Sequence, residues 1–337
     1  MKTDYLQVLV TLVAASVAAC TKATISVSSS STGKVSPSTD LSKYAKQWTV
    51  SGSGNADKID TIDISLAGNV FVSYTDGLPK GVLGYLNVTG DSQAVVDAVT
   101  VTYKQFLNVT AAATPTGHVL TELLLSSNGA VTLVDCSRAA NVVIEEGVLT
   151  TDADLLIDVS DSSAVYVSAA DTAFSTKDLT LDVSGSASLQ LRAKSMSAGS
   201  VVMDVEGSAS ISVLSPLFES NDLTLDTESG GTICIDAKEV TTGDYWGEGA
   251  SKISMPKASD KHGSTGTFAC EGSSIPVRGP DSVPSASMNS NTSSSTTADT
   301  SKSSRSETSP EESSSSALRK LDLKEFFIVG LALMAIM

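Results

Sequence analysis

Apolar and polar residues alternate along the middle of the chain, and this alternation recurs in four similar segments of thirteen residues. The copies begin at Leu155, Leu179, Val201 and Leu223, so successive copies lie 24, 22 and 22 residues apart. Each copy has three apolar positions separated by polar ones, then a turn of Gly, Ser or Asp, then a second short alternating stretch. Strict alternation places every second side chain on one face of a strand, so each copy predicts two short β-strands around a turn.

One such unit cannot bury its apolar face alone, whereas stacked copies form a continuous core. The nearly constant period of about 22 residues therefore predicts an all-β protein built as a parallel β-solenoid, in which each copy is one coil. Small residues at the turns, such as Gly185 and Gly207, would let neighbouring coils approach closely. A β-sandwich of hairpins is the alternative, and the constant period argues against it because sandwich loops vary freely in length.

The part of the chain before these copies, residues 48–149, also contains alternating stretches but is less regular. Examples are residues 62–66 and 70–74, which flank Ala67-Gly68-Asn69. No long segment has the periodicity of a helix. We expect this part to continue the stack and to contain its N-terminal cap, which gives a predicted solenoid head domain over residues 44–275.

The first residues have the parts of a secretory signal peptide, predicted for residues 1–19: a basic start, an apolar run and small residues for cleavage. Residues 17–20 (Val-Ala-Ala-Cys) also match a bacterial lipobox, in which Cys20 would be lipidated. A serine-rich stretch follows, and we expect residues 20–43 to be a Ser/Thr-rich linker.

The C-terminal part predicts a disordered stalk and a lipid anchor. Residues 276–316 are dominated by Ser and Thr, a composition typical of an O-glycosylated stalk in an exported protein. Residues 317–337 contain a polar spacer and a twelve-residue apolar tail, the pattern of a GPI-anchor signal that is removed. Ser315 is the expected attachment residue. The GPI pattern favours an extracellular protein held at the plasma membrane over a bacterial lipoprotein.

Export permits N-glycosylation and disulfide bonds. Sequons predict glycan attachment at Asn87, Asn108 and Asn291. If Cys20 leaves with the signal peptide, three of the four cysteines remain, and Cys234 with Cys270 are the nearest pair among them. We expect these two to form a disulfide near the end of the folded domain. The cysteines and histidines have no spacing that suggests zinc.

The chain of 337 residues has a net charge of −16, and only 5% of its residues are aromatic. The acidic charge would repel nucleic acid and excludes it as a partner. The few aromatic residues leave the core to Val, Leu, Ile and Ala, which suits regularly stacked strands.

Four aspartates occupy the same position in the four copies: Asp158, Asp182, Asp204 and Asp226. In a parallel solenoid, equivalent residues stack about 4.8 Å apart, and carboxylates that close repel one another. They could bind a cation such as Ca²⁺ or read a cationic ligand. They could equally form a solvated face whose charges splay into water and are screened by salt.

The stretch from Trp48, together with residues 59–70, resembles the start of the auto-transporter adhesin head domain, also called the head GIN domain. The turns at 182–188 and 204–210, Asp-Val-(Ser/Glu)-Gly-Ser-Ala-Ser, are similar to the repeated Gly-Ser turns of that family. The resemblance covers roughly residues 44–235 and implies a right-handed β-helix at the cell surface without transferable catalytic residues. The predicted anchor makes this chain similar to a eukaryotic version of such a protein.

Two functions follow from these observations. The first is a non-enzymatic surface protein that adheres to cell-wall or host-surface glycans or proteins, with no cofactor required. The second is an extracellular polysaccharide lyase or hydrolase that uses paired carboxylates of the aspartate row. An enzyme of that kind would need aromatic platforms and a basic partner, and the four copies contain few aromatics. No nucleophile or phosphate-loop motif occurs in a fitting context, so the sequence favours the first function.

Overall fold

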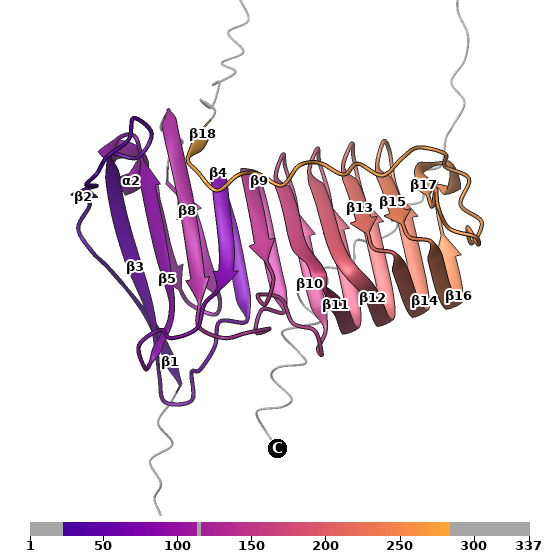
Figure 1. Cartoon of the computed structure of the whole chain (residues 1–337), viewed down its shortest axis with the longest axis horizontal. Helices are drawn as coiled ribbons and strands as arrows, with labels where there is room; N and C mark the ends of the chain where they lie inside the picture. Colours follow the sequence, from indigo (N-terminus) through magenta and orange to yellow (C-terminus); the bar gives the residue numbers. More distant parts are fainter. Residues whose placement is uncertain (1–22, 113–115, 284–337) are drawn as a thin grey trace, which may run out of the picture. The chain divides into compact units, whose positions relative to one another are not determined.

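The structure, a computed structural model, describes residues 23–112 and 116–283 and consists almost entirely of β-strands (Figure 1). Strands account for 60% of it and helices for 3%, and the strands form a β-solenoid of about five turns. The prediction of an all-β solenoid is therefore confirmed. None of the helices in these residues is long and apolar enough to cross a membrane.

The less regular N-terminal half contains nine strands among the described residues. They are β1 (Thr24–Ser29), β2 (Gly33–Lys34), β3 (Tyr44–Ser53), β4 (Thr61–Tyr74), β5 (Val82–Gly90), β6 (Val99–Tyr103), β7 (Leu107–Ala111), β8 (Gly117–Leu125) and β9 (Leu133–Glu145). One short helix, α2 (Gln93–Ala98), begins at Ser92, whose hydroxyl accepts a hydrogen bond from the Val95 N–H.

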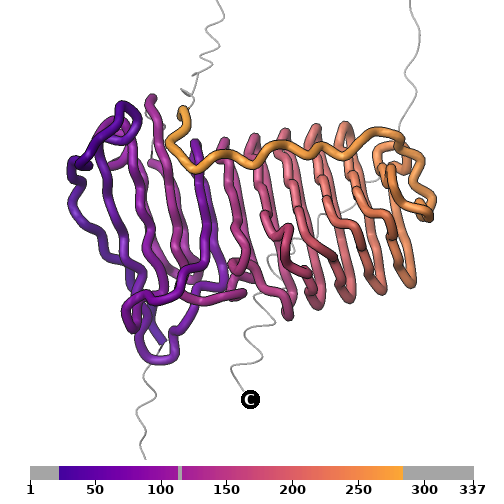
Figure 2. Tube along the Cα trace, in the orientation of Figure 1, coloured from indigo at the N-terminus to yellow at the C-terminus, as the bar shows by residue number. Residues whose placement is uncertain are grey.

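The repeated half forms the regular coils. Its strands are β10 (Leu155–Val159), β11 (Ala164–Val183), β12 (Ser188–Val205), β13 (Ser210–Leu214), β14 (Leu217–Thr227), β15 (Thr232–Asp236), β16 (Glu239–Gly247) and β17 (Ile253–Ser254), with the 3-10 turn η1 (Ala250–Lys252) before β17 and the short strand β18 (Asp281–Val283) near the end. Strands of successive coils pair in parallel, and Figure 2 shows the coils lying one after another along the stack.

Alternation decides which side chains enter the core. On β11, Leu179, Leu181 and Val183 point inward and are at most 1% exposed, whereas Thr180 and Asp182 face outward. The register then places Val201, Met203 and Val205 of β12 directly beside them. Full burial of each large aliphatic side chain contributes about 2 kcal/mol, so the stacked apolar columns stabilise neighbouring coils together.

The turns stack as closely as the strands. Gly185 and Gly207 both have a left-handed backbone, with φ of 75° and 81°. The N–H of Ser208 donates to the carbonyl of Gly185 at 2.8 Å, and the N–H of Ser186 donates likewise to Asp161 at 2.7 Å. A Cβ added at Gly207 would lie 2.6 Å from the Gly185 oxygen, so this approach requires glycine.

The N-terminal half continues the stack only in part. Residues 61–72 of β4 pair in parallel with 133–144 of β9, and β7 also pairs in parallel with β4. By contrast, β5 pairs antiparallel with β3 on one side and with β8 on the other, at this end of the sheet. Strand β1 lies within the expected linker and pairs with β3, because Ile25 and Val27 alternate with polar residues and pack on the core.

After β17 the chain turns back along the coils. This segment, residues 256–283, is called the strap here; Figure 2 shows it in orange, crossing the stack to β18, which pairs antiparallel with β8. Near its end, Arg278 forms ion pairs with Glu122 at 2.6 Å and with Glu145, and lies over the ring of Phe71. These contacts carry the folded part to Val283, eight residues beyond the expected boundary at 275.

Candidate functional site

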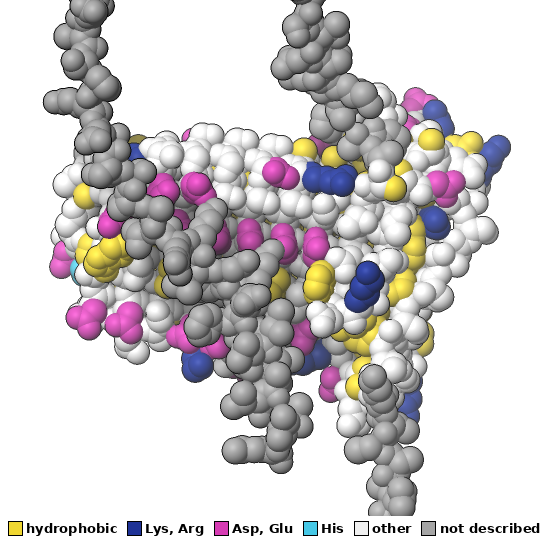
Figure 3. Space-filling view, turned by 180° about the vertical axis from the view of Figure 1, so that it is seen from behind, with side chains coloured by type: hydrophobic (Ala, Val, Ile, Leu, Met, Phe, Trp, Pro, Cys, Tyr) yellow, Lys and Arg dark blue, Asp and Glu magenta, His cyan; other side chains and the backbone are white. Residues whose placement is uncertain are grey.

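The predicted aspartates lie in register on one outward-facing side of the stack. Asp158 pairs with Asp182, Asp182 with Asp204, and Asp204 with Asp226. On each strand, the residues directly before and after the aspartate point into the core, so the aspartate points outward. Neighbouring strands in a sheet lie about 4.8 Å apart. Figure 3, viewed from behind, shows acidic side chains in a row along the coils.

Two further aspartates extend this row. Asp63 on β4 pairs with Asp135 on β9, and Asp135 pairs with Asp158. The sequence prediction missed them because they precede the regular 22-residue period. A local signal was present, since Asp63, Asp135, Asp158 and Asp182 are all followed two residues later by serine. We define the acidic row as these members: Asp63, Asp135, Asp158, Asp182, Asp204 and Asp226.

The row ends on one side and is extended by a glutamate on the other. Beyond Asp63, the partner on β7 is the neutral Asn108. Beyond Asp226, the N–H of Glu248 donates to the carbonyl of Leu225 at 2.9 Å, which places Glu248 next along the stack, directly after β16. The exposed face therefore presents one acidic side chain per coil from β4 to the residue that follows β16.

Partial burial and the neighbouring charges of the row both raise the pKa of Asp204. Partial burial, followed by the charges of Asp182, Asp226, Glu228 and Glu206, raises this pKa from 3.8 to about 6. The folded protein therefore holds a proton at Asp204 between about pH 4 and pH 6, where the unfolded chain has lost it. The contribution of Asp204 to the free energy of unfolding therefore falls as the pH rises through this window. Above the window, the full loss of stability is present.

Asp204→Asn is therefore expected to stabilise the fold at pH 7 and to have no such effect below pH 4. The pKa shift corresponds to a change of at most about 3 kcal/mol in the free energy of unfolding. Solvent screening of the exposed side chain reduces this change to about 1 kcal/mol. Denaturant unfolding at both pH values measures the difference. Glu219→Gln is the matched control, because Glu219 lies in register with Ser197 and Thr241 instead of acidic residues. Equal effects of the two substitutions at pH 7 would contradict repulsion along the row.

The row does not gather its carboxylates around one point. Among residues 23–112 and 116–283, no group of three or more His, Cys, Asp or Glu side chains is arranged to hold a metal ion. Oxygen cages for Ca²⁺ normally bring six to eight ligands to one centre. A calcium site on Asp158, Asp182, Asp204 and Asp226 stays a prediction, and the geometry suits an extended ligand better than a single ion.

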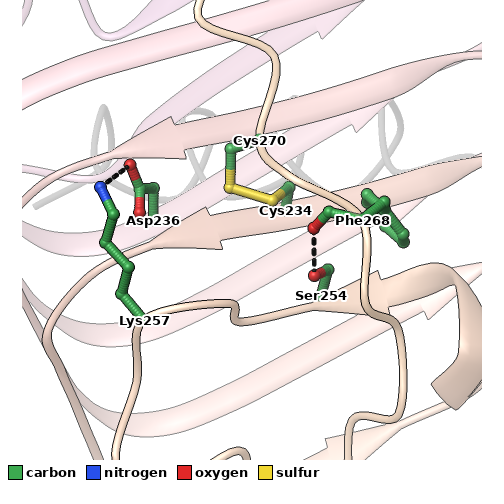
Figure 4. The surroundings of a disulfide bond; sticks show 6 residues. All are labelled: Cys234, Asp236, Ser254, Lys257, Phe268 and Cys270. Atoms are coloured by element: carbon green, nitrogen blue, oxygen red, sulfur yellow. Dashed lines mark hydrogen bonds and ion pairs between the residues drawn. A yellow bond between two sulfur atoms is a disulfide. The ribbon is translucent and has the colours of Figure 1, made fainter.

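Cys234 and Cys270 form a disulfide, with Cα atoms 5.1 Å apart, that joins β15 to the strap (Figure 4). Beside it, Lys257 forms an ion pair with Asp236 at 2.8 Å, and the Ser254 hydroxyl donates to the carbonyl of Phe268 at 2.6 Å. The remaining cysteine of the described chain, Cys136, is buried and free. Burial, with the charges of Asp135, Asp63 and Asp158, raises the pKa of its thiol, which therefore stays protonated.

Two predicted glycosylation residues lie within strands. Asn87 on β5 accepts a hydrogen bond from the side-chain amide of Gln47 at 2.8 Å, and Asn108 stands at the end of the acidic row. Both are partly exposed. The third sequon residue, Asn291, and the expected anchor residue, Ser315, lie outside the described residues, as do Cys20, the signal peptide and the anchor signal.

The solved structures that match this chain include three bacterial proteins described as "putative adhesins". Those from Bacteroides fragilis, Parabacteroides distasonis and Parabacteroides merdae are 12%, 13% and 13% identical to this chain, with TM-scores of 0.34, 0.37 and 0.35. The matches cover 66%, 66% and 69% of this chain and 92%, 95% and 94% of theirs. At this level of similarity the likeness does not extend to function. No protein-family model and no curated protein matches the chain.

Proposed function

We propose that this protein is a non-enzymatic surface protein whose solenoid presents the acidic row to extended glycans of a cell wall or a neighbouring cell. The observation that carries the proposal is the in-register stacking of six aspartates on consecutive parallel strands of an exposed face. A rigid face with one identical group per coil suits a polymer that repeats at the same interval. A small ligand would use only a fraction of it.

The course of the strap supports a protein that is tethered near β8 and exposes its last coils to a ligand. The described chain ends at Val283, which pairs with Gly117 on β8, whereas β16 and β17 lie at the opposite end of the stack (Figure 1). A tether that follows Val283 would hold the protein near β8 and leave the β16 end free. The Ser/Thr-rich composition of residues 284–316 and the GPI pattern of residues 317–337 suit such a tether.

Anchoring through Ser315 and glycosylation at Asn87, Asn108 and Asn291 form part of the same proposal. A phospholipase C specific for GPI anchors is expected to release the protein from intact cells. Protein that stays with the membrane after complete digestion of a reference anchor would contradict the anchor and leave the binding proposal untouched.

Polysaccharide cleavage is the second candidate, and the raised pKa of Asp204 is the observation in its favour, because general acids have pKa values near 6. The exposed position of Asp204 weighs against it, since catalytic acids are normally enclosed with a bound substrate. Release of reducing ends or unsaturated products from any tested polysaccharide, abolished by Asp204→Asn, would establish the enzyme instead.

Retention of the folded protein on insoluble cell-wall polysaccharides, with calcium and with a chelator, tests the proposed function. We expect saturable binding to at least one polymer that weakens as salt is added, because the row acts through charge. Binding that survives the chelator would show that the carboxylates contact the polymer without a bridging Ca²⁺ ion. Absence of binding to every polymer and to host cells, with folding intact, would overturn the proposal and favour a purely structural coat.

A further inference from the structure

An exposed tryptophan lies beside the end of the acidic row. Trp246 on β16 is 50% exposed, unlike Trp48, which is only 4% exposed. Its register partner is Thr224, so its side chain stands on the outward face of the sheet that carries the row. The neighbouring Tyr245 alternates inward and packs against the core, which fixes the strand beneath the indole.

Carboxylates surround this indole on the same face. Asp244 lies two residues before Trp246 on β16 and points to the same side. Glu248 lies two residues after Trp246, one position past the end of the strand, and its N–H donates to the carbonyl of Leu225, which places it beside Asp226. Across the ladder, Asp222 pairs with Asp244, and Asp226 occupies the other diagonal position. These four residues form no ion pair with the part of the chain that the structure describes.

One of these carboxylates contains an acceptor atom that lacks a partner. Oδ1 of Asp226 is shielded from solvent and accepts no hydrogen bond from any described residue. Leaving a buried acceptor unsatisfied costs free energy, which rotation of the carboxylate toward a donor on a ligand would recover. The site therefore combines a large apolar ring with surrounding negative charge and an acceptor that has no hydrogen-bond partner among the described residues.

This combination fits a cation with an apolar body. Tryptophan is the best aromatic partner for an ammonium group, and its face also packs against the C–H side of a sugar ring. A protonated amino sugar supplies both groups in one monomer. A neutral sugar would leave the four negative charges without partners.

The spacing of the row counts against a basic peptide. Side chains on one side of an extended peptide recur every two residues, or about 6.6–6.8 Å, which does not match the spacing of about 4.8 Å between coils. The choice of a sugar rests on Trp246, because an exposed indole face packs against the C–H side of a sugar ring.

We propose that Trp246, with Asp222, Asp226, Asp244 and Glu248, is a binding subsite for an amino sugar with a free amine, at the end of a polymer laid along the acidic row. This inference rests on the proposed function and names its ligand class. It assigns Trp246 the role of a stacking platform and the four carboxylates the role of ammonium partners.

Fluorescence titration of the full folded chain tests the subsite. The chain has two tryptophans, and because Trp48 is buried, quenching by the neutral quencher acrylamide reports mainly on Trp246. We expect glucosamine oligomers to protect Trp246 from acrylamide, whereas N-acetylglucosamine oligomers of equal length bind at least about tenfold more weakly. Binding of the glucosamine oligomers should weaken as salt rises.

Substitutions separate the subsite from the rest of the row. Trp246→Ala should weaken binding of glucosamine oligomers about tenfold, Trp246→Phe should weaken it less, and Glu219→Gln should leave it unchanged. Unfolding curves verify that each variant folds.

Four results would overturn this assignment. Equal affinity for the acetylated oligomers would exclude ammonium recognition while leaving the proposed glycan binding intact. Unchanged affinity in Trp246→Ala would exclude the platform, and equally tight binding of oligolysine would exclude the sugar assignment. Failure of every polysaccharide to bind would overturn the proposed function as well.

Discussion

Gly207→Ala is expected to destabilise the protein by about 3 kcal/mol, although it adds only one methyl group. Alanine pays about 1 kcal/mol to adopt a left-handed backbone, and φ at Gly207 is 81°. The new Cβ would also lie 2.6 Å from the carbonyl oxygen of Gly185, a backbone atom that cannot rotate away. Either the coils must separate at this turn, or the Ser208–Gly185 hydrogen bond must break. Denaturant unfolding measures the loss.

Gly77→Ala provides the matched control for this substitution. Gly77 has nearly the same φ, 82°, but an added Cβ would meet nothing within 4 Å. Its cost should therefore be about 1 kcal/mol, the backbone contribution alone. The difference between the two variants isolates the close stacking of coils. Equal destabilisation would contradict the requirement for glycine at stacked turns.

Removing the disulfide with Cys234→Ala and Cys270→Ala should cost roughly 4 kcal/mol, because the bond closes a loop with a sequence separation of 36 residues. The bond ties the strap to the face that carries Gln190, Ser212 and Cys234 in register. All three side chains point outward from the coils, yet they are at most 6% exposed. We expect this face to gain solvent access when the strap is released, which hydrogen exchange at β12, β13 and β15 would detect.

A reducing agent supplies the control for the disulfide prediction. It should lower the stability of the unmodified protein by about the same amount and leave the double-alanine variant unchanged. The free thiol of Cys136 takes no part, because it is fully buried within the coils. If stability and exchange stayed the same after the bond is removed, the ion pairs of Arg278 and the pairing of β18 would have to hold the strap alone.

The repeated coils could be predicted from the sequence because one simple pattern recurs at a nearly constant period. Residues such as Leu179, Leu181 and Val183 encode both the strand and the face that it buries, and the next copy repeats them in register. The same regularity placed four aspartates on one line. Where alternation and period act together, local sequence determines the structure with little need for long-range information.

The parts that sequence reasoning missed depend on irregular, long-range contacts. Strand β1 was not predicted because its segment is rich in serine. Its alternating Ile25 and Val27 pack against the core through the pairing of β1 with β3. The strap has no periodicity, and its course depends on contacts such as Arg278 with Glu122, 156 residues away in sequence. The antiparallel pairing of β3, β5 and β8 has no counterpart in the repeats.

The candidate site was predicted in part for the same reason. Asp63 and Asp135 were not predicted from the 22-residue period, because Asp135 lies 72 residues after its register partner Asp63. Trp246 escaped because β16 lacks the leucines of the other copies, so residues 239–247 do not look like a fifth coil. Only the register with β14 places the indole beside the acidic row.

The most direct test of the acidic row as a binding face is retention on cell-wall polysaccharides of the unmodified protein beside the double variant Asp182→Asn, Asp204→Asn. Glu219→Gln serves as the control for loss of charge elsewhere on the coils. We expect the double variant to fold at least as stably as the unmodified protein and to lose binding at least about tenfold, while the control binds normally. Unchanged retention of a folded double variant would contradict the account.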